Sequence, residues 1–206
     1  EALTDLLHDG LVQVSIDRSR GDSPQMAALV DRIPGARLLD DDGRWRRYLI
    51  AQHRPGGVPV GVSIPIAAVT ANAWAPDAPR VIDGRIDVGW HSGNDQIGHE
   101  SFEIDLGTPQ VVGGLVIEMG RFSFGYPQEL VVDADRTGDG SFLEVWRGRP
   151  ARATVQAALD HPERVPLTID LGRVETRRLR LRQVGSAAGI PWWIPELAVT
   201  APVSAE

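Results

Sequence analysis

Short apolar runs that alternate with polar residues dominate the chain beyond about residue 60. In Phe102–Leu106 and Leu179–Arg182 every second side chain is apolar, which is typical of a strand with one face in a core and the other in water. Similar runs recur between turn residues at Gly114–Met119, Leu130–Ala134, Phe142–Arg147 and Leu167–Leu171. Short strands at regular spacing predict a sandwich or a barrel, and a jelly roll is the architecture that we favour. Ala151–Leu159 is the one helix-like interruption and is either a short helix or a loop.

The first 53 residues have a different, mixed pattern. Leu3, Leu6 and Leu7 share one helical face that Gly10 ends, and Leu11–Ile16 then alternates as a short strand. The elements expected next are a helix that starts at Pro24 and strands at Ala36–Leu39 and Arg44–Ala51, joined by the turn Asp40–Gly43. This order predicts a small α/β domain.

A cluster of Pro and Gly residues separates the two patterns. Arg54–Pro59 contains two prolines and two glycines, so regular backbone pairing is expected to fail there. The predicted organisation is a small α/β domain at 1–53, a linker at 54–59 and a β-sandwich at 60–202. The chain as a whole is therefore expected to be mainly β.

Composition narrows the range of functions. Hydrophobic residues make up 42% and charged residues 24% of the chain, which fits a globular protein with a packed core. A net charge of -7 argues against nucleic acid as a partner, because such binding needs a basic face. Without cysteine, neither disulfides nor thiol chemistry is possible.

The most apolar stretch, Val111–Met119, is too short to span a membrane. Since the chain begins at Glu1 without a leader, we expect it to be a piece of a longer protein.

Four segments of the second domain, taken in order, carry a family resemblance. They are Val81–Ser92, Phe102–Gly107, Gly125–Pro127 followed by Asp139-Gly140, and Arg177–Arg182 followed by Trp192–Leu197. Together they resemble the discoidin family, also called the coagulation-factor type C family, which includes galactose-binding carbohydrate-binding modules. The order and spacing over about 130 residues give these short motifs their weight. The resemblance implies a discoidin-like jelly-roll β-sandwich for the second domain.

The same resemblance implies a structural calcium ion. Members of the family hold it with the Asp of an Asp-Gly pair and a Glu near the C-terminus, which match Asp83 and Glu196, together with backbone carbonyls. Asp87 could add a carboxylate, and Ca²⁺ prefers six to eight oxygen ligands. Val88 replaces the usual Thr, so one hydroxyl that relatives contribute is missing. The other interpretation is that Asp83 belongs to a plain turn and that Glu196 caps a strand or pairs with an Arg.

Sugar binding is the function that the resemblance implies for the loops at one end of the sandwich. Relatives place a binding His and a binding Arg where this chain has His91 and Arg121, and Asn94 in the intervening loop could add a polar contact. Planar polar groups and an aromatic face are what sugar hydroxyls and ring C–H groups require. Four large aromatics lie in two predicted loops: Phe122, Phe124, Trp192 and Trp193. The predicted ligand-binding set is His91, Arg121, Phe122, Phe124, Trp192 and Asn94.

Other interpretations of these aromatics stay open. One of Trp192 and Trp193 is expected in the core, because alternate residues of a strand point inward, and Trp90 is expected there too. Phe122 or Phe124 could simply close the end of the sandwich. In discoidin-like domains without a sugar ligand, the same loops bind proteins or phospholipid head groups. A net acidic module suits anionic membranes poorly, so docking on a protein or within the parent chain is the main alternative.

Catalysis within this chain is not expected. The five histidines stand in no metalloprotease or nucleophile-elbow context, and no Gly-rich phosphate loop follows a strand. Glu103 and Asp105 would share one strand face, which a solvated sheet surface explains without an acid/base pair. We predict no catalytic residues here.

The first domain carries a second, weaker resemblance. Its element order and the apolar strand containing Tyr48 look like the soluble tail of actinobacterial membrane glycosyltransferases of the arabinofuranosyl- or mannosyltransferase type. The resemblance implies a non-catalytic, extracytoplasmic region that binds cell-wall polysaccharide and is tethered to the plasma membrane through a preceding membrane domain. The expected partners are therefore a cell-envelope glycan and that parent membrane domain.

Overall fold

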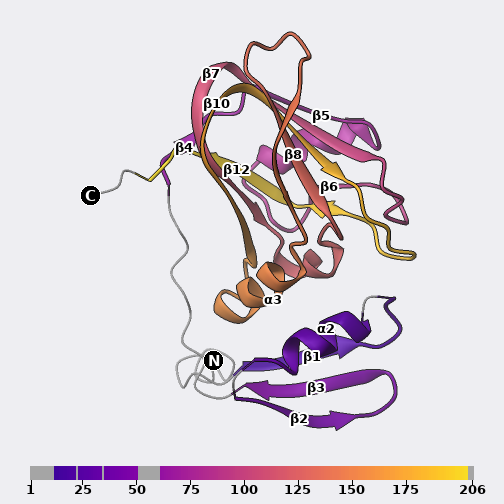
Figure 1. The fold of residues 1–206 in the computed structure, drawn as a ribbon. Coiled ribbons are helices and arrows are strands. Elements are labelled where there is room, and N and C mark those ends of the chain that lie inside the picture. The colour runs from indigo at the N-terminus through magenta and orange to yellow at the C-terminus, as the bar shows by residue number, and fades with distance from the viewer. Residues whose placement is uncertain (1–11, 22, 34, 51–60, 204–206) are drawn as a thin grey trace.

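The chain folds into a small three-stranded unit and a larger β-sandwich (Figure 1). The structure is a computed structural model that describes residues 12–21, 23–33, 35–50 and 61–203. The helix expected around Leu3–Leu7 and the linker expected at 54–59 lie outside these described residues.

The small unit contains β1 (Val12–Asp17), α2 (Ser23–Val30), β2 (Ala36–Asp41) and β3 (Trp45–Ile50). The strands form an antiparallel sheet in the order β1-β3-β2. The hairpin between β2 and β3 turns at Gly43, which has a φ of 86°, and Asp42 accepts hydrogen bonds there from the backbone N–H groups of Arg44 and Trp45. Both helix and strands follow the sequence pattern, so this part of the prediction is confirmed.

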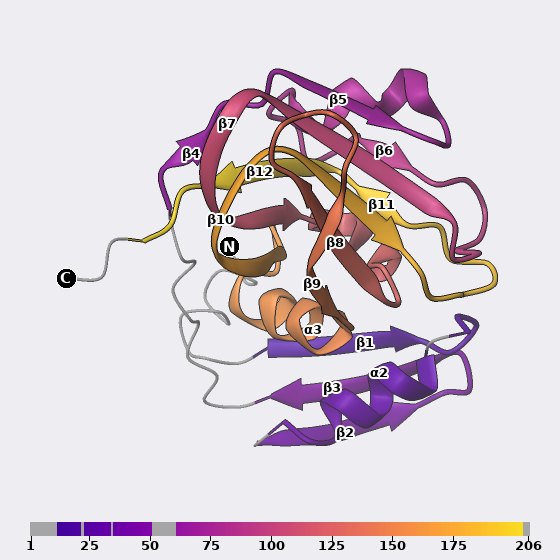
Figure 2. The same ribbon diagram turned by 45° about the horizontal axis from the view of Figure 1, so that its top comes forward.

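Two long strands organise the sandwich: β7 (Glu100–Glu118) and β10 (Pro166–Gln183), which pair along most of their length. The sequence predicted two separate strands for each of them, and this detail was wrong. Gly107, with a φ of 77°, and the register shifts in β10 after Asp170 and Thr176 bend both strands without interrupting them. Figure 2 shows the two strands curving together.

The bend divides the sheet into two layers. The first half of β7 pairs with β5 (Ala68–Ala71), and the last part of β10 pairs with β8 (Leu130–Asp135), which pairs with β9 (Leu143–Gly148). The second half of β7 pairs with β12 (Glu196–Thr200), which pairs with β4 (Ser63–Ile64). A short ribbon of β6 (Trp90–His91) and β11 (Trp193–Ile194) lies at one end. The predicted jelly-roll sandwich is thereby confirmed.

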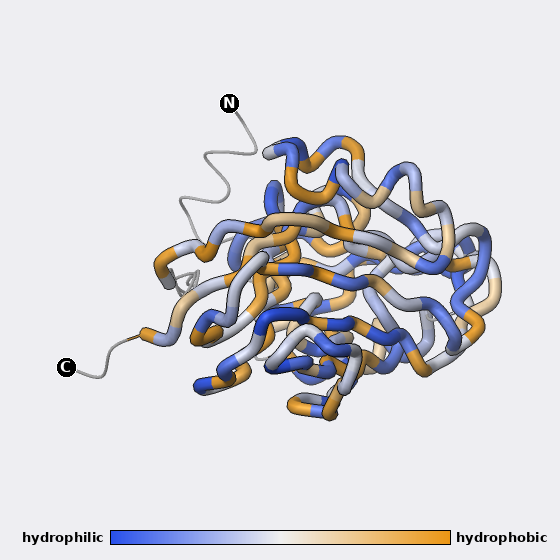
Figure 3. Tube along the Cα trace, turned by 90° about the horizontal axis from the view of Figure 1, so that it is seen from above, coloured by the Kyte–Doolittle hydropathy of each residue, from blue (hydrophilic) through white to orange (hydrophobic). Residues whose placement is uncertain are grey.

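The sandwich core lies between the layers. Polar and apolar positions alternate along much of the sandwich strands (Figure 3), so that one face of these stretches is buried, whereas β8 is buried on both faces. The largest fully buried side chains in the sandwich include Trp90, Trp192, Phe102 and Tyr126. Trp90 and Trp192 form a T-shaped, edge-to-face pair with their ring centroids 5.2 Å apart. The quadrupoles of aromatic rings favour this arrangement.

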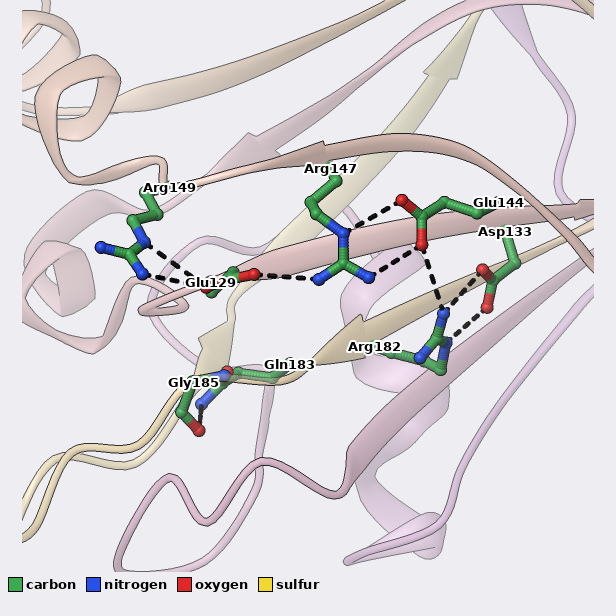
Figure 4. A network of polar contacts seen from close by, with 8 residues as sticks. All are labelled: Glu129, Asp133, Glu144, Arg147, Arg149, Arg182, Gln183 and Gly185. Carbon is green, nitrogen blue, oxygen red and sulfur yellow. Dashed lines mark hydrogen bonds and ion pairs between the residues drawn. The ribbon is translucent and has the colours of Figure 1, made fainter.

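The outer face of the layer that contains β8, β9 and the last part of β10 carries a network of ion pairs (Figure 4). The carboxylate of Asp133 on β8 accepts hydrogen bonds from Arg182 and Arg180 on β10. Arg147 on β9 lies between Glu144 and Glu129. These contacts tie neighbouring strands of the layer together through their side chains.

Helix α3 (Ala151–Asp160) connects the sandwich with the small unit. The stretch that the sequence left as helix or loop is this helix. Its Val155 and Leu159 pack in one apolar cluster with Ile16, Tyr48 and other core residues of the small unit. Figures 1 and 2 both place α3 beside β1. The two units therefore share apolar contacts.

Candidate functional site

The ribbon of β6 and β11 positions the candidate site. Trp193 pairs with His91, and Ile194 pairs with Trp90. Because side chains alternate across a strand, Trp90 and Ile194 are fully buried, whereas His91 and Trp193 are half-buried on the opposite side. The buried pair anchors the ribbon, and the other pair faces outward at the end of the sandwich.

Four aromatic rings form a continuous line there. The ring of Phe122 stacks on Trp193 with centroids 4.2 Å apart and an interplanar angle of 13°. Trp193 lies 4.7 Å from the His91 ring, and His91 lies 5.2 Å from Trp74. Trp74 as a whole residue is 57% exposed. The line therefore begins among packed rings and ends at an aromatic face in contact with solvent.

Two short 3-10 segments supply the outer members of this line. Phe122 belongs to η2 (Gly120–Gly125), and Trp74 precedes η1 (Ala75–Ile82) with a φ of 48°. Gly125 allows the close approach of η2 to β11, because a Cβ at that position would lie 2.5 Å from Cδ1 of Trp193. A side chain at residue 125 would thus displace the ring that Phe122 stacks on.

Beside the aromatic line lies a groove with a volume of about 300 Å³. His91, Arg121, Phe122 and Trp193 all line it, and so do Asp77, Arg80 and Asp87. Arg80 is paired with Asp77 at 3.2 Å. The groove therefore combines aromatic carbon with charged and polar groups at its rim.

The hydrogen bonds of His91 and Arg121 indicate what each can offer a ligand. His91 Nδ1 accepts from the backbone N–H of Gly93 at 3.2 Å, so in the neutral imidazole the proton is on Nε2 and that nitrogen can donate. Arg121 donates one bond, at 2.8 Å, to the carbonyl oxygen of Asp87 and lies over the Phe122 ring at 4.8 Å. The guanidinium has five N–H donors, so it retains donors for a ligand.

The structure brings together three of the six predicted ligand-binding residues: His91, Arg121 and Phe122. Trp192 is not at the surface; it is 0% exposed, and Trp193 takes the groove position instead. Phe124 lies under Arg20 of the small unit, outside the groove. Asn94 is exposed and does not line the groove.

Trp74 is the groove neighbour that the sequence analysis missed. It lies in Ala73-Trp74-Ala75-Pro76, a stretch with no strand pattern and outside the motifs that carry the family resemblance. The only signal in the sequence is a large aromatic next to a Pro-rich turn. Its contact with His91 depends on a left-handed backbone conformation that residue type does not predict for Trp.

The predicted cation ligands Asp83 and Glu196 lie close together. The backbone N–H of Gly84 donates to Glu196 Oε2 at 3.1 Å. Burial, with the nearby carboxylates of Asp83 and Glu118, raises the pKa of Glu196 to about 7. A partly buried carboxylate beside other negative charges fits a bound cation.

Asp87 takes a different position. Its carboxylate is exposed and pairs with the guanidinium of Arg85 at 3.2 Å, which lowers its pKa. Among the described residues, no group of three or more His, Asp or Glu side chains could hold a metal ion. A calcium ion at Asp83 and Glu196 would therefore need backbone carbonyls to complete its oxygen shell.

Comparisons with known proteins identify the fold. No family model matches the chain, and no curated protein matches it. A family 32 carbohydrate-binding module of Clostridium perfringens NanJ, solved with galactose, is 20% identical with a TM-score of 0.51, covering 68% of this chain and 98% of that one. The corresponding module of AlyQ, solved with 4,5-unsaturated mannuronic acid, is 17% identical with a TM-score of 0.52, covering 67% and 97%.

A longer AlyQ structure includes an alginate lyase domain beside its carbohydrate-binding module. It is 17% identical with a TM-score of 0.54, and the match covers 71% of this chain but only 34% of that one. The chain therefore shares the discoidin-like fold of family 32 carbohydrate-binding modules. No helix in the part of the chain that the structure describes has the length and apolar character needed to cross a membrane.

Proposed function

We propose that the β-sandwich is a non-catalytic carbohydrate-binding module whose ligand occupies the groove beside Trp193. The observation that carries the proposal is the convergence of His91, Arg121 and an aromatic line on one groove, although these residues are far apart in the sequence. The fold that the chain shares with sugar-binding modules supports it.

Each group has a role in this proposal. The exposed ring of Trp74, at the end of the aromatic line, packs against the apolar C–H surface of a sugar ring. His91 Nε2–H donates to one hydroxyl, and the planar guanidinium of Arg121 donates to an adjacent pair of oxygens. The groove holds few charged groups that are free of protein partners, since Arg80 pairs with Asp77 and Asp87 pairs with Arg85. A neutral sugar therefore suits it.

The natural ligand, the cellular location and the parent enzyme are proposed from the resemblance of the first domain alone. The ligand would be a cell-envelope polysaccharide, and the chain would be an extracytoplasmic region, tethered to the plasma membrane, of an arabinofuranosyl- or mannosyltransferase. A structural calcium held by Asp83 and Glu196 is proposed as well. It would stabilise the loop that leads from η1 toward β6 and so support the groove.

Binding is tested by following backbone amide NMR signals during titration with galactose, N-acetylgalactosamine, mannose and arabinose. Saturable shifts are expected around His91 and Trp193 for at least one of these sugars. The shifts should be lost in His91→Ala and Arg121→Ala, and retained in the matched exposed controls His99→Ala and Arg136→Ala. Shifts that are equal in all four variants would reject the groove as the binding site.

The same aromatic line supports docking on a protein as a second function. The observation in favour of docking is Trp74, a large exposed aromatic that no groove wall encloses. Trp74→Ala separates the two functions. Sugar binding predicts a weaker affinity for the sugar, whereas docking predicts unaltered sugar titrations and loss of association with the parent protein.

A further inference from the structure

A second cavity lies between the small unit and the sandwich, away from the groove. Its volume is about 420 Å³, within the range of small-molecule sites, about 300 to 1,000 Å³. Its walls come from five elements: β1, α2, β3, α3 and η2. Figure 2 shows the boundary at which β1 faces α3.

The lining is largely apolar. Ile16, Met26 and Val30 of the small unit line it together with Val155 and Leu159 of α3, and all five belong to or pack against one apolar cluster. The pocket is open to solvent, so these apolar walls contact water, and an apolar occupant would be stabilised by covering them.

Thr154 places an unused polar group in the cavity wall. The residue is 1% exposed, and its Oγ1 forms no hydrogen bond among the described residues. Buried hydroxyls are nearly always hydrogen-bonded, because burying one without a partner is costly. The hydroxyl of Thr154 is thus available to a polar atom of a ligand in the cavity.

Arg20 places a positive charge in the wall of the cavity. Its guanidinium lies over the Phe124 ring, 4.3 Å from the centroid, and both residues line the cavity. Asp17 is the acidic residue in the same wall, and its carboxylate already accepts bonds from the N–H and the hydroxyl of Ser19. Within the described ranges, Arg20 forms no ion pair. Arg20 can therefore receive an anion.

We propose that this cavity binds an amphiphilic carboxylate, with its alkyl body between α2, β1 and α3 and its head group on Arg20. Charge complementarity selects the anion, and the apolar walls select the alkyl chain. An extended peptide lying along the free edge of β1 is the competing occupant, because β1 is an edge strand of its sheet. The peptide would need backbone hydrogen bonds and no carboxylate. The proposal is independent of sugar binding in the groove.

The test is a titration of the whole chain with decanoate, followed by calorimetry and by amide NMR shifts. Decanoate is expected to bind at one site and to shift the signals of α3 and β1. Decanol, which has the same chain without the charge, should bind about ten-fold more weakly, the typical loss of one charge-assisted contact. In Arg20→Gln this preference should disappear, whereas Arg37→Gln, an exposed arginine outside the cavity, should retain it.

A cavity-filling pair on one helix gives a second control. Ala158 lines the cavity and Ala153 is exposed on the same helix, so Ala158→Trp should abolish decanoate binding and Ala153→Trp should not. Circular dichroism checks that each variant is folded. The proposal is overturned if wild-type protein shows no decanoate binding at about 1 mM, a loose threshold for a specific small ligand. It is also overturned if decanol binds as well as decanoate, because the apolar walls alone would then account for binding.

Discussion

The carboxylate of Asp133 is the most deeply buried charge in the ion-pair network of Figure 4. Its side chain is 3% exposed, and it accepts bonds from Arg182 at 2.6 and 2.9 Å and from Arg180 at 3.2 Å. Burial alone would raise the pKa of Asp133, but Arg182 and Arg180 outweigh it, so the pKa lies below its ordinary value of 3.8. Arg182 provides two of these three bonds.

Replacing Arg182 with Met would keep most of the side chain's apolar stem and remove both of its bonds. A bond to a charged group contributes about 1.5 to 3 kcal/mol. Since Arg182 is 35% exposed, water screens part of its interaction and can enter after the replacement. We expect a loss of about 2 to 3 kcal/mol in the free energy of unfolding at pH 7, because the buried carboxylate keeps only Arg180. For a chain of this size the loss lowers Tm by roughly 5 to 10 °C.

The pH dependence provides the sharper test. A carboxyl group with a lowered pKa in the folded state stabilises the fold above its unfolded pKa, and this stabilisation is lost as the pH falls through the folded pKa. In Arg182→Met the lowering of the Asp133 pKa is weakened. The stability difference from wild type should therefore be largest at neutral pH and shrink below about pH 4, near the ordinary pKa of an aspartate.

Urea unfolding at pH 7 and at pH 3, followed by circular dichroism, measures this difference. Arg149→Met is the matched control: Arg149 is 80% exposed, and its partner Glu129 is also held by Arg147 at 2.9 Å. That variant should remain within about 0.5 kcal/mol of wild type, as surface ion pairs usually do. Equal losses in the two variants, or an Arg182→Met deficit that is unchanged at pH 3, would refute this account of the network.

Three further predictions concern the groove and its supports. Phe124→Ala should leave the NMR shifts induced by the bound sugar unaltered, whereas Phe122→Ala should weaken them, because only Phe122 stacks on the groove wall; equal effects would place Phe124 in the site. Gly89→Ala should lower Tm strongly in a thermal melt, since its φ is 146° and a Cβ there would lie 2.4 Å from Cα of Pro195; an unchanged Tm would contradict this geometry. Calcium should raise the Tm of wild type but not of Glu196→Gln, with EGTA as the control, and a calcium-independent wild-type Tm would rule out the proposed ion.

The alternation of side chains predicted the sandwich layers well. Phe102 and Ile104 are fully buried, and Glu103 and Asp105 between them are on the water side of β7, as the period of two requires. The continuity of β7 through Gly107 was not predictable in the same way. A glycine inside a strand weakens it and often marks a bulge or a bend, and here β10 bends alongside β7 and keeps the backbone paired. The continuity of β7 therefore depends on its pairing with β10, a segment far away in the sequence.

The role of α3 was hidden for a related reason. Val155 and Leu159 are four residues apart and share one helical face, so the sequence indicates that this face is covered. It does not indicate what covers it. The structure shows that the small unit does so, through Ile16 and neighbouring residues. Local periodicity predicts which face of a helix is buried. Which part of the chain covers that face depends on the arrangement of the whole chain.

The choice between Trp192 and Trp193 was decided by the same kind of long-range contact. Alternation requires that one of two adjacent tryptophans points inward, but the pairing of Trp193 with His91 determines which one. Trp192 then packs on Trp90 beneath the ribbon, and this buried pair holds His91 and Trp193 side by side. His91, predicted to bind the ligand, and Trp90, predicted to lie in the core, thus belong to the same short ribbon of β6 and β11. A substitution at Trp192 would disturb the groove without touching its ligand.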